Sequence, residues 1–178
     1  MQFCSTDIDG ITQVHLEPAV DNRGAFARLH CPDEFSQAGH PFVPVQTSLS
    51  RNDRALTLRG MHFEPEPHEE AKLVRVTRGR IFDVAVDLRP DSPTFHRWAG
   101  FELSADNGMA LLIGPGLAHG FLTLEDGTDV LYQIDRVFRP GHGRGVRWDD
   151  PTFAIAWPDI PAVISERDAA YPDFKLLG

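Results

Sequence analysis

The chain has few cysteines and few basic residues, and it has no long apolar run. Its two cysteines, Cys4 and Cys31, are too few for a disulfide framework, so we expect free thiols in a reducing compartment. Lysine and arginine total 17 against 26 acidic residues, and the resulting net charge of −9 argues against nucleic acid as a general partner. No segment has the length of a membrane span, and the first residues lack the basic and apolar regions of a signal peptide. We therefore expect a cytoplasmic protein with no membrane partner.

The residues that are present favour β-strands around one core. With 42% hydrophobic residues, positions 1–178 are expected to form a single domain. Three short segments rich in turn-forming residues each connect two strand-like segments. The connected pairs are 73–77 and 81–88, 99–103 and 109–113, and 117–124 and 128–137. This pattern predicts three successive hairpins in an antiparallel sandwich or barrel. Short helices are expected only near the ends, over 32–39 and 165–170.

Several proton-handling side chains stand in these segments on faces that their neighbours mark as buried. Lys72 shares a strand face with Val74 and Val76, Tyr132 with Val130 and Ile134, and His119 with Leu117 and Phe121. Because successive strand residues point to opposite faces, these polar groups are expected to face the core. A buried ionisable group is costly unless it is paired or used, so several converging on one interior predict a functional site.

His62 is the first candidate for chemistry at that site. It follows Arg59 and Gly60, and a glycine lets the backbone pass close to a ligand, while histidine exchanges protons near neutral pH. Lys72 could stabilise an enolate, and Tyr132 could return a proton to carbon. The alternatives are a core histidine bonded to a carbonyl, a lysine whose ammonium reaches solvent, and a core tyrosine with one hydrogen bond. The residues alone leave both interpretations open.

Two further hypotheses concern the role of Asp168 and a possible metal site. Asp168 could bond to an imidazole and set its tautomer, or it could be an acid at the start of a helix, favoured there by the macrodipole. A histidine and carboxylate set could instead bind a divalent metal, although its spacing in the sequence is loose. The members of that set are His62, Glu64, His68, Glu69, Glu70 and His119.

The ordered motifs resemble the dTDP-4-dehydrorhamnose 3,5-epimerase family, a metal-independent branch of the cupins. The motifs are Asp21-Asn22-Arg23-Gly24, Leu58-Arg59-Gly60-Met61-His62-Phe63, Ala71-Lys72-Leu73-Val74-Arg75, Phe82-Asp83-Val84-Ala85-Val86-Asp87-Leu88-Arg89, Ser92-Pro93-Thr94-Phe95, Ala118-His119-Gly120-Phe121, Tyr132, Arg147-Trp148-Asp149-Asp150-Pro151 and Ser165-Glu166-Arg167-Asp168. The resemblance implies an all-β cupin-type double-stranded β-helix (jelly roll) with short helices near the N- and C-terminal parts. It also implies a homodimer that needs no cofactor and no metal.

The resemblance further implies an isomerase of deoxysugar biosynthesis that inverts C3, C5 or both in a nucleotide-diphosphate-linked 4-keto sugar. His62, paired with Asp168, would remove the proton next to the ketone, Lys72 would stabilise the enolate oxygen, and Tyr132 would return a proton from the opposite face. Arg23 and Arg59 would grip the diphosphate, for which the planar guanidinium fork is well matched. The remaining implied substrate contacts are Gln46, His119 and Phe138.

The chain departs from the family pattern at positions near the sugar. Phe138 replaces a second tyrosine, Gly143 a glutamate and Ser48 an asparagine, and Gly114-Pro115-Gly116 replaces Pro-Glu-Gly. The base, the cation and the acid are kept, so inversion chemistry is expected while the sugar contacts differ. The alternatives are a metal-dependent cupin enzyme and a catalytically silent nucleotide-sugar binder.

Overall fold

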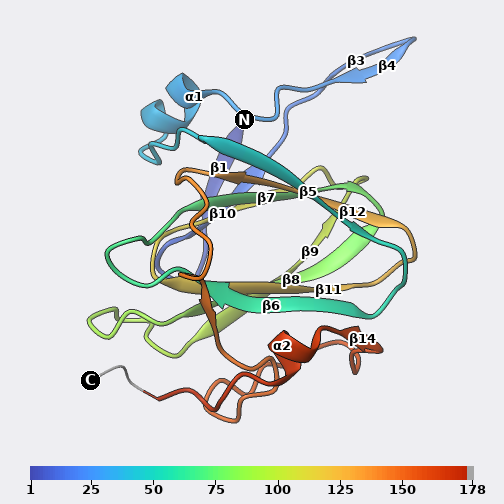
Figure 1. Cartoon of the computed structure of the whole chain (residues 1–178). Coiled ribbons are helices and arrows are strands. Elements are labelled where there is room, and N and C mark those ends of the chain that lie inside the picture. Colours follow the sequence, from blue (N-terminus) through green and yellow to red (C-terminus); the bar gives the residue numbers. More distant parts are fainter. Residues whose placement is uncertain (176–178) are drawn as a thin grey trace.

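Two β-sheets packed face to face form the body of the structure, a computed structural model that describes residues 1–175 (Figure 1). The first sheet has the order β1 (Gln2–Ser5), β2 (Ile11–His15), β10 (Ala110–Ile113), β7 (Lys72–Arg78), β12 (Thr128–Ile134) and β5 (Gln46–Asn52). The second has the order β13 (Arg144–Gly145), β6 (Thr57–Phe63), β11 (Leu117–Thr123), β8 (Arg80–Asp87) and β9 (Trp98–Ser104), and β14 (Val163–Ile164) pairs in parallel with β6. The predicted jelly roll is confirmed.

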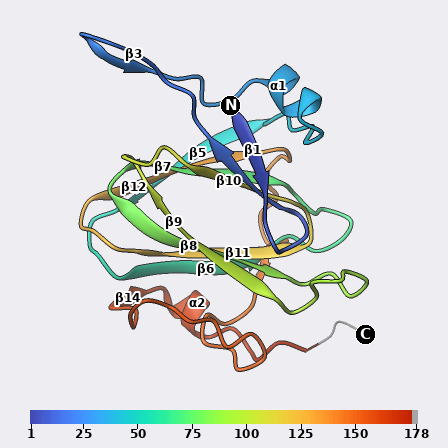
Figure 2. The same cartoon turned by 180° about the vertical axis from the view of Figure 1, so that it is seen from behind.

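The remaining elements lie outside the two sheets. A hairpin of β3 (Ala19–Asp21) and β4 (Gly24–Phe26) projects away from the sandwich, as the front and back views show (Figures 1 and 2). Helix α1 (Pro32–Gln37) begins at the expected proline, and α2 (Glu166–Ala169) is capped by the Ser165 hydroxyl, so both predicted helices are confirmed. No helix in residues 1–175 is long and apolar enough to cross a membrane.

The three predicted hairpins are wrong, because each tight turn carries the chain from one sheet to the other. β7 pairs with β10 and β12, whereas β8 pairs with β9 and β11. β9 and β10 also belong to different sheets, as do β11 and β12. A turn signal specifies a local reversal of the chain. Whether the two flanking strands bond to each other or splay apart is decided by distant strands that compete for their edges.

The interior between the sheets is built by the predicted alternation. Val74 and Val76 of β7 and Val130 of β12 meet Ile81, Ala85 and Phe121 of the opposite sheet in one buried cluster. Tyr132 packs against the same cluster. Lys72 therefore shares its face with core residues, as expected, and the functional groups of both sheets point into one interior.

A second buried cluster holds the C-terminal segment against the outer face of the second sheet. Val146 and Phe153 pack there on Met61, Val84 and Ala118. This contact places the chain after β13 beneath β6, as both views show (Figures 1 and 2). It thereby brings α2 to the strand that carries His62.

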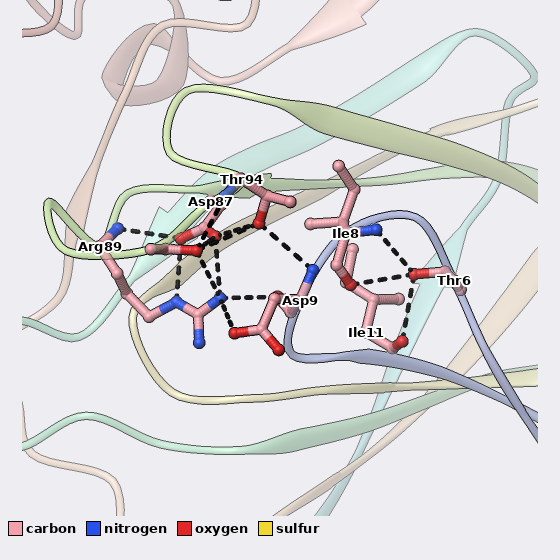
Figure 3. A network of polar contacts seen from close by, with 8 residues as sticks. Thr6, Ile8, Asp9, Ile11, Asp87, Arg89 and Thr94 are labelled. Carbon is pink, nitrogen blue, oxygen red and sulfur yellow. Dashed lines mark hydrogen bonds and ion pairs between the residues drawn. The ribbon is translucent and has the colours of Figure 1, made fainter.

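A polar network ties the loop after β1 to the loop between β8 and β9 (Figure 3). The fully buried Asp87 carboxylate accepts hydrogen bonds from the Arg89 Nε at 2.9 Å and the Thr94 hydroxyl at 2.6 Å. Arg89 also donates to the Asp9 carbonyl at 2.7 Å, and the Asp9 amide donates to Thr94 at 3.2 Å. Burial alone would raise the pKa of Asp87, but the bonds from Arg89, Ser92 and Thr94 lower it to about 2.

Replacing Asp87 with asparagine is expected to destabilise the fold at neutral pH by about 2 kcal/mol, the equivalent of its pKa shift from 3.8 to about 2. A folded-state pKa below the unfolded value gives stability that is complete above the unfolded pKa and is lost as the pH falls through the folded one. Urea unfolding at pH 7 and pH 3 measures this. The difference between wild type and variant should shrink at pH 3, and the exposed Asp91→Asn is the control. An unchanged difference would contradict the assignment.

Candidate active site

Most of the predicted site residues line one cavity of about 830 Å³ between the sheets. Seven of the nine predicted residues are among its walls, namely Arg59, His62, Lys72, His119, Tyr132, Phe138 and Asp168. Gln46 lines an adjoining cavity together with His62 and Lys72. Side chains from β7, β11 and β12 thus converge as the alternation predicts, and β6 and α2 add Arg59, His62 and Asp168.

His62 and Asp168 form a direct pair. The Nε2 atom of His62 lies 2.8 Å from the Asp168 Oδ1, and the Gly60 amide donates to Oδ2 at 3.2 Å. Burial alone would raise the pKa of Asp168, but the bond and the charge interaction with His62 lower it below its ordinary value. A charged carboxylate on Nε2 sets the tautomer and leaves Nδ1 to accept a proton. Asp168 also lies in the first turn of α2, so both sequence interpretations of this residue hold.

Gly60 has a different role from the expected close approach to a ligand. Its φ is +133°, and a Cβ there would lie 2.5 Å from the Cα of Gly120. Only glycine fits both the conformation and the space, because β6 and β11 approach each other at this point. The same pairing sets His62 opposite His119.

Lys72 is ion-paired inside the cavity. Its Nζ lies 3.1 Å from the Glu70 Oε1, and the two side chains are only 11% and 12% exposed. The alternative of an ammonium reaching solvent is therefore wrong. Glu70 precedes Lys72 by two positions, just before β7 begins, so this ion pair is local in the sequence.

Tyr132 belongs to a group at the inner end of the cavity. Its ring is edge-on to His119 with centroids 5.9 Å apart, and the His119 Nε2 lies 2.7 Å from the Oδ1 of the fully buried Asp83. Burial and the nearby Asp83 charge raise the pKa of Tyr132 well above its usual value. The phenol is therefore protonated at neutral pH and can serve as a proton donor.

The two arginines predicted to bind a diphosphate lie apart. Arg59 lines the cavity and its Nε donates to the Asn52 side chain at 2.7 Å. Arg23 sits at the tip of the β3–β4 hairpin, is 85% exposed and pairs with Asp21. The chain therefore does not bring Arg23 to its own cavity.

Two residues of the C-terminal segment lie at the cavity or beside it, and the sequence analysis missed both. Arg167 lines the cavity and donates to the Gly143 carbonyl at 3.2 Å. The Tyr171 ring contacts His62 edge-on, with centroids 6.2 Å apart, and the Arg167 guanidinium carbon lies 5.8 Å from the centroid of the Tyr171 ring. Proximity to Asp168 in the sequence was the only signal for either residue.

The alternative metal cluster is not assembled. Within residues 1–175, no three histidine, cysteine or carboxylate side chains are grouped so that they could hold an ion. Of the six residues considered, His62 and His119 are instead each paired with an aspartate, and Glu70 with Lys72. The cavity's polar groups are thus arranged as acid–base pairs.

The fold and the site define a cupin-type jelly roll equipped for proton transfer at carbon next to a carbonyl, with a paired imidazole, an ammonium and a protonated phenol. The model of the family described as dTDP-4-dehydrorhamnose 3,5-epimerase matches residues 5–175. The chain belongs to that family, and the prediction of an epimerase is confirmed.

Individual relatives agree with this assignment. The dTDP-4-dehydrorhamnose 3,5-epimerase of Sinorhizobium fredii is 39% identical, over 97% of this chain and 89% of the relative. The Bacillus anthracis enzyme, crystallised with TDP and PPi bound, superposes with a TM-score of 0.94 at 37% identity, covering 97% of this chain and 99% of that one. The 3′-monoepimerase ChmJ of Streptomyces bikiniensis, in complex with dTDP-quinovose, has a TM-score of 0.88 at 33% identity and covers 94% and 85%.

Proposed function

We propose that the protein inverts one or both carbons next to the ketone of a dTDP-linked 4-keto-6-deoxyhexose. The observation that carries the proposal is the convergence of the His62–Asp168 pair, Lys72 and the protonated Tyr132 on one cavity. The nucleotide is proposed from the relatives, whose structures hold TDP or a dTDP-sugar. Proton removal and return at carbon change no oxidation state, so the reaction needs no redox cofactor.

The positions of the base and the acid suit an inversion. His62 lies on β6 of the second sheet, whereas Tyr132 and Lys72 lie on β12 and β7 of the first. A sugar ring held between the sheets turns one face toward each of them. His62 removes the proton on one face and Tyr132 donates to the other, which inverts the carbon. Lys72 stabilises the enolate oxygen that forms between these steps.

The working form is proposed to be a homodimer, in which the projecting hairpin reaches a second copy. Val20 and Phe26 of this hairpin are 74% and 79% exposed, an apolar surface that a partner would cover. Arg23, at the hairpin tip, then reaches the diphosphate bound by the other protomer. Sedimentation of the protein as a monomer at micromolar concentration would contradict this part of the proposal.

Replacing Arg59 with alanine is expected to raise KM about 10- to 100-fold while kcat stays within about twofold. The expected size corresponds to the loss of one charge-assisted hydrogen bond to the diphosphate. A diphosphate contact remote from the reacting carbon acts equally on the ground and transition states. Steady-state kinetics measures both constants. Arg28→Ala, which removes the same charge beside α1, is the control. A large fall in kcat with unchanged KM would contradict the assignment.

The function is tested by incubating the purified protein with dTDP-4-keto-6-deoxyglucose in deuterated water. NMR identifies the carbons that exchange, and analysis of the product sugar identifies those that invert. Exchange at C3 or C5 with inversion, unchanged after exhaustive chelation, is expected. Activity that chelation abolishes and one divalent ion restores would favour the metal-dependent alternative. Binding without exchange would favour the silent binder.

A further inference from the structure

A second cavity of about 420 Å³ adjoins the catalytic one. Its walls include His62, Lys72 and Phe138, which also line the first cavity, and it extends beyond them to Glu64, Glu70 and Gly143. A ligand held against His62 therefore has space to place its substituents in this second cavity.

The two carboxylates of the second cavity differ in their partners. Glu70 is paired with Lys72, so its charge is already balanced. The Oε2 atom of Glu64 is buried, and it has no hydrogen-bond partner in residues 1–175. A buried carboxylate oxygen without a donor is costly, and a donor supplied by a ligand would remove that cost.

The nearby cations are engaged elsewhere. Arg144 donates to the carbonyls of Gly141 at 3.1 Å and His142 at 2.8 Å, and Arg167 donates to the Gly143 carbonyl. Position 143 itself makes room for Glu64, because a Cβ on Gly143 would lie 3.0 Å from the Glu64 Oε1. The absent side chain at 143 thus leaves Glu64 as an acceptor at this end of the site.

We propose that Glu64 is a specificity-determining residue that accepts a hydrogen bond from a C2 or C3 hydroxyl of the bound sugar. This inference rests on the proposed function and names the part of the substrate that the second cavity recognises. The terminal torsion of a glutamate turns easily, so the carboxylate can meet a hydroxyl that enters beside His62. A site built to bond a hydroxyl discriminates strongly against an analogue that lacks it, because the acceptor is then left unpaired.

The test compares Glu64→Ala and Glu64→Gln with wild type on the 4-keto sugar and on its 2-deoxy and 3-deoxy analogues. Turnover is measured as deuterium exchange next to the ketone, because C3 of the 3-deoxy analogue is not a stereocentre. For the hydroxylated substrate, kcat/KM should fall about 10- to 100-fold in Glu64→Ala and less in Glu64→Gln. For one of the two deoxy analogues, wild type and Glu64→Ala should be equal. Glu66→Gln, in the exposed loop that follows, is the matched control and should behave as wild type. Equal losses on all three sugars, or no loss, would overturn the proposal.

A binding measurement separates this proposal from the proposed function. Calorimetry with dTDP-glucose and its 2-deoxy and 3-deoxy analogues needs no turnover. Wild type should bind dTDP-glucose more tightly than one analogue, and Glu64→Ala should lose that preference while binding dTDP unchanged. If wild type catalyses no exchange, the proposed function fails, yet this comparison still decides the role of Glu64. If Glu64→Ala does not fold, Glu64→Gln provides the same test, because glutamine has nearly the same side-chain shape as glutamate.

Discussion

Replacing His62 with alanine is expected to lower kcat about 10²- to 10⁴-fold, the range of a positioned general base. The fold and dTDP binding should be retained, because His62 is 41% exposed in the cavity and carries no part of the core. The physical reason is accessibility, because both histidines of the cavity are paired with a carboxylate, but the His62 side chain is 41% exposed and that of His119 only 4%. His119 is paired with Asp83 and is almost fully buried. Rates of deuterium incorporation at C3 and C5 measure the effect.

The His62–Asp168 pair provides the control for this result. If Asp168 acts through His62, the double variant His62→Ala with Asp168→Asn should lose little more than His62→Ala alone. His15→Ala on β2, whose ring contacts the Gln13 side chain, should keep normal turnover. Near-normal turnover of His62→Ala would identify His62 as a packing residue and would contradict the proposed mechanism.

Replacing Tyr132 with phenylalanine is expected to abolish inversion while some deuterium exchange continues. Exchange on the base's own face needs only His62 and an enolate stabilised by Lys72, whereas inversion needs a proton from the other face. The raised pKa of Tyr132 keeps that proton on the phenol at neutral pH. NMR of the recovered substrate detects the exchange, and sugar analysis of the product detects the inversion.

The second tyrosine of the chain is the matched control. Tyr171 also lies near His62, but its buried hydroxyl has no partner within the described part of the chain. Tyr171→Phe removes the same atom and should retain both exchange and inversion. If Tyr132 were only a core residue, its variant would lose exchange and inversion together, or neither.

Two of the departures from the family pattern, Phe138 and Gly143, lie at the two cavities. Phe138 is 66% exposed and lines both cavities, and Gly143 leaves its space to Glu64. A loop glycine and a strand-end glutamate far away in the sequence are thus related by space alone. The sequence shows that a side chain is missing at 143, but it does not show which residue takes the vacant volume.

The alternation of residues along single strands was sufficient to predict several features of the site. The alternation along β7, β11 and β12 correctly predicts that Lys72, His119 and Tyr132 face the interior. Hydrophobic burial acts on each strand separately, and it orients every second side chain without reference to the strand's partners. The positions of the two short helices were likewise predicted, because residues such as the proline at the start of α1 act within one turn.

The sequence by itself therefore determined which residues face the interior, which local segments are strands or helices, and which side chains can exchange protons. The tertiary structure alone decided the crossing of each turn between sheets, the meeting of His62 with Asp168 over 106 positions, and the displacement of Arg23 from its own cavity. These outcomes depend on which distant surfaces pack together. Packing is a property of the whole chain, and no local pattern encodes it.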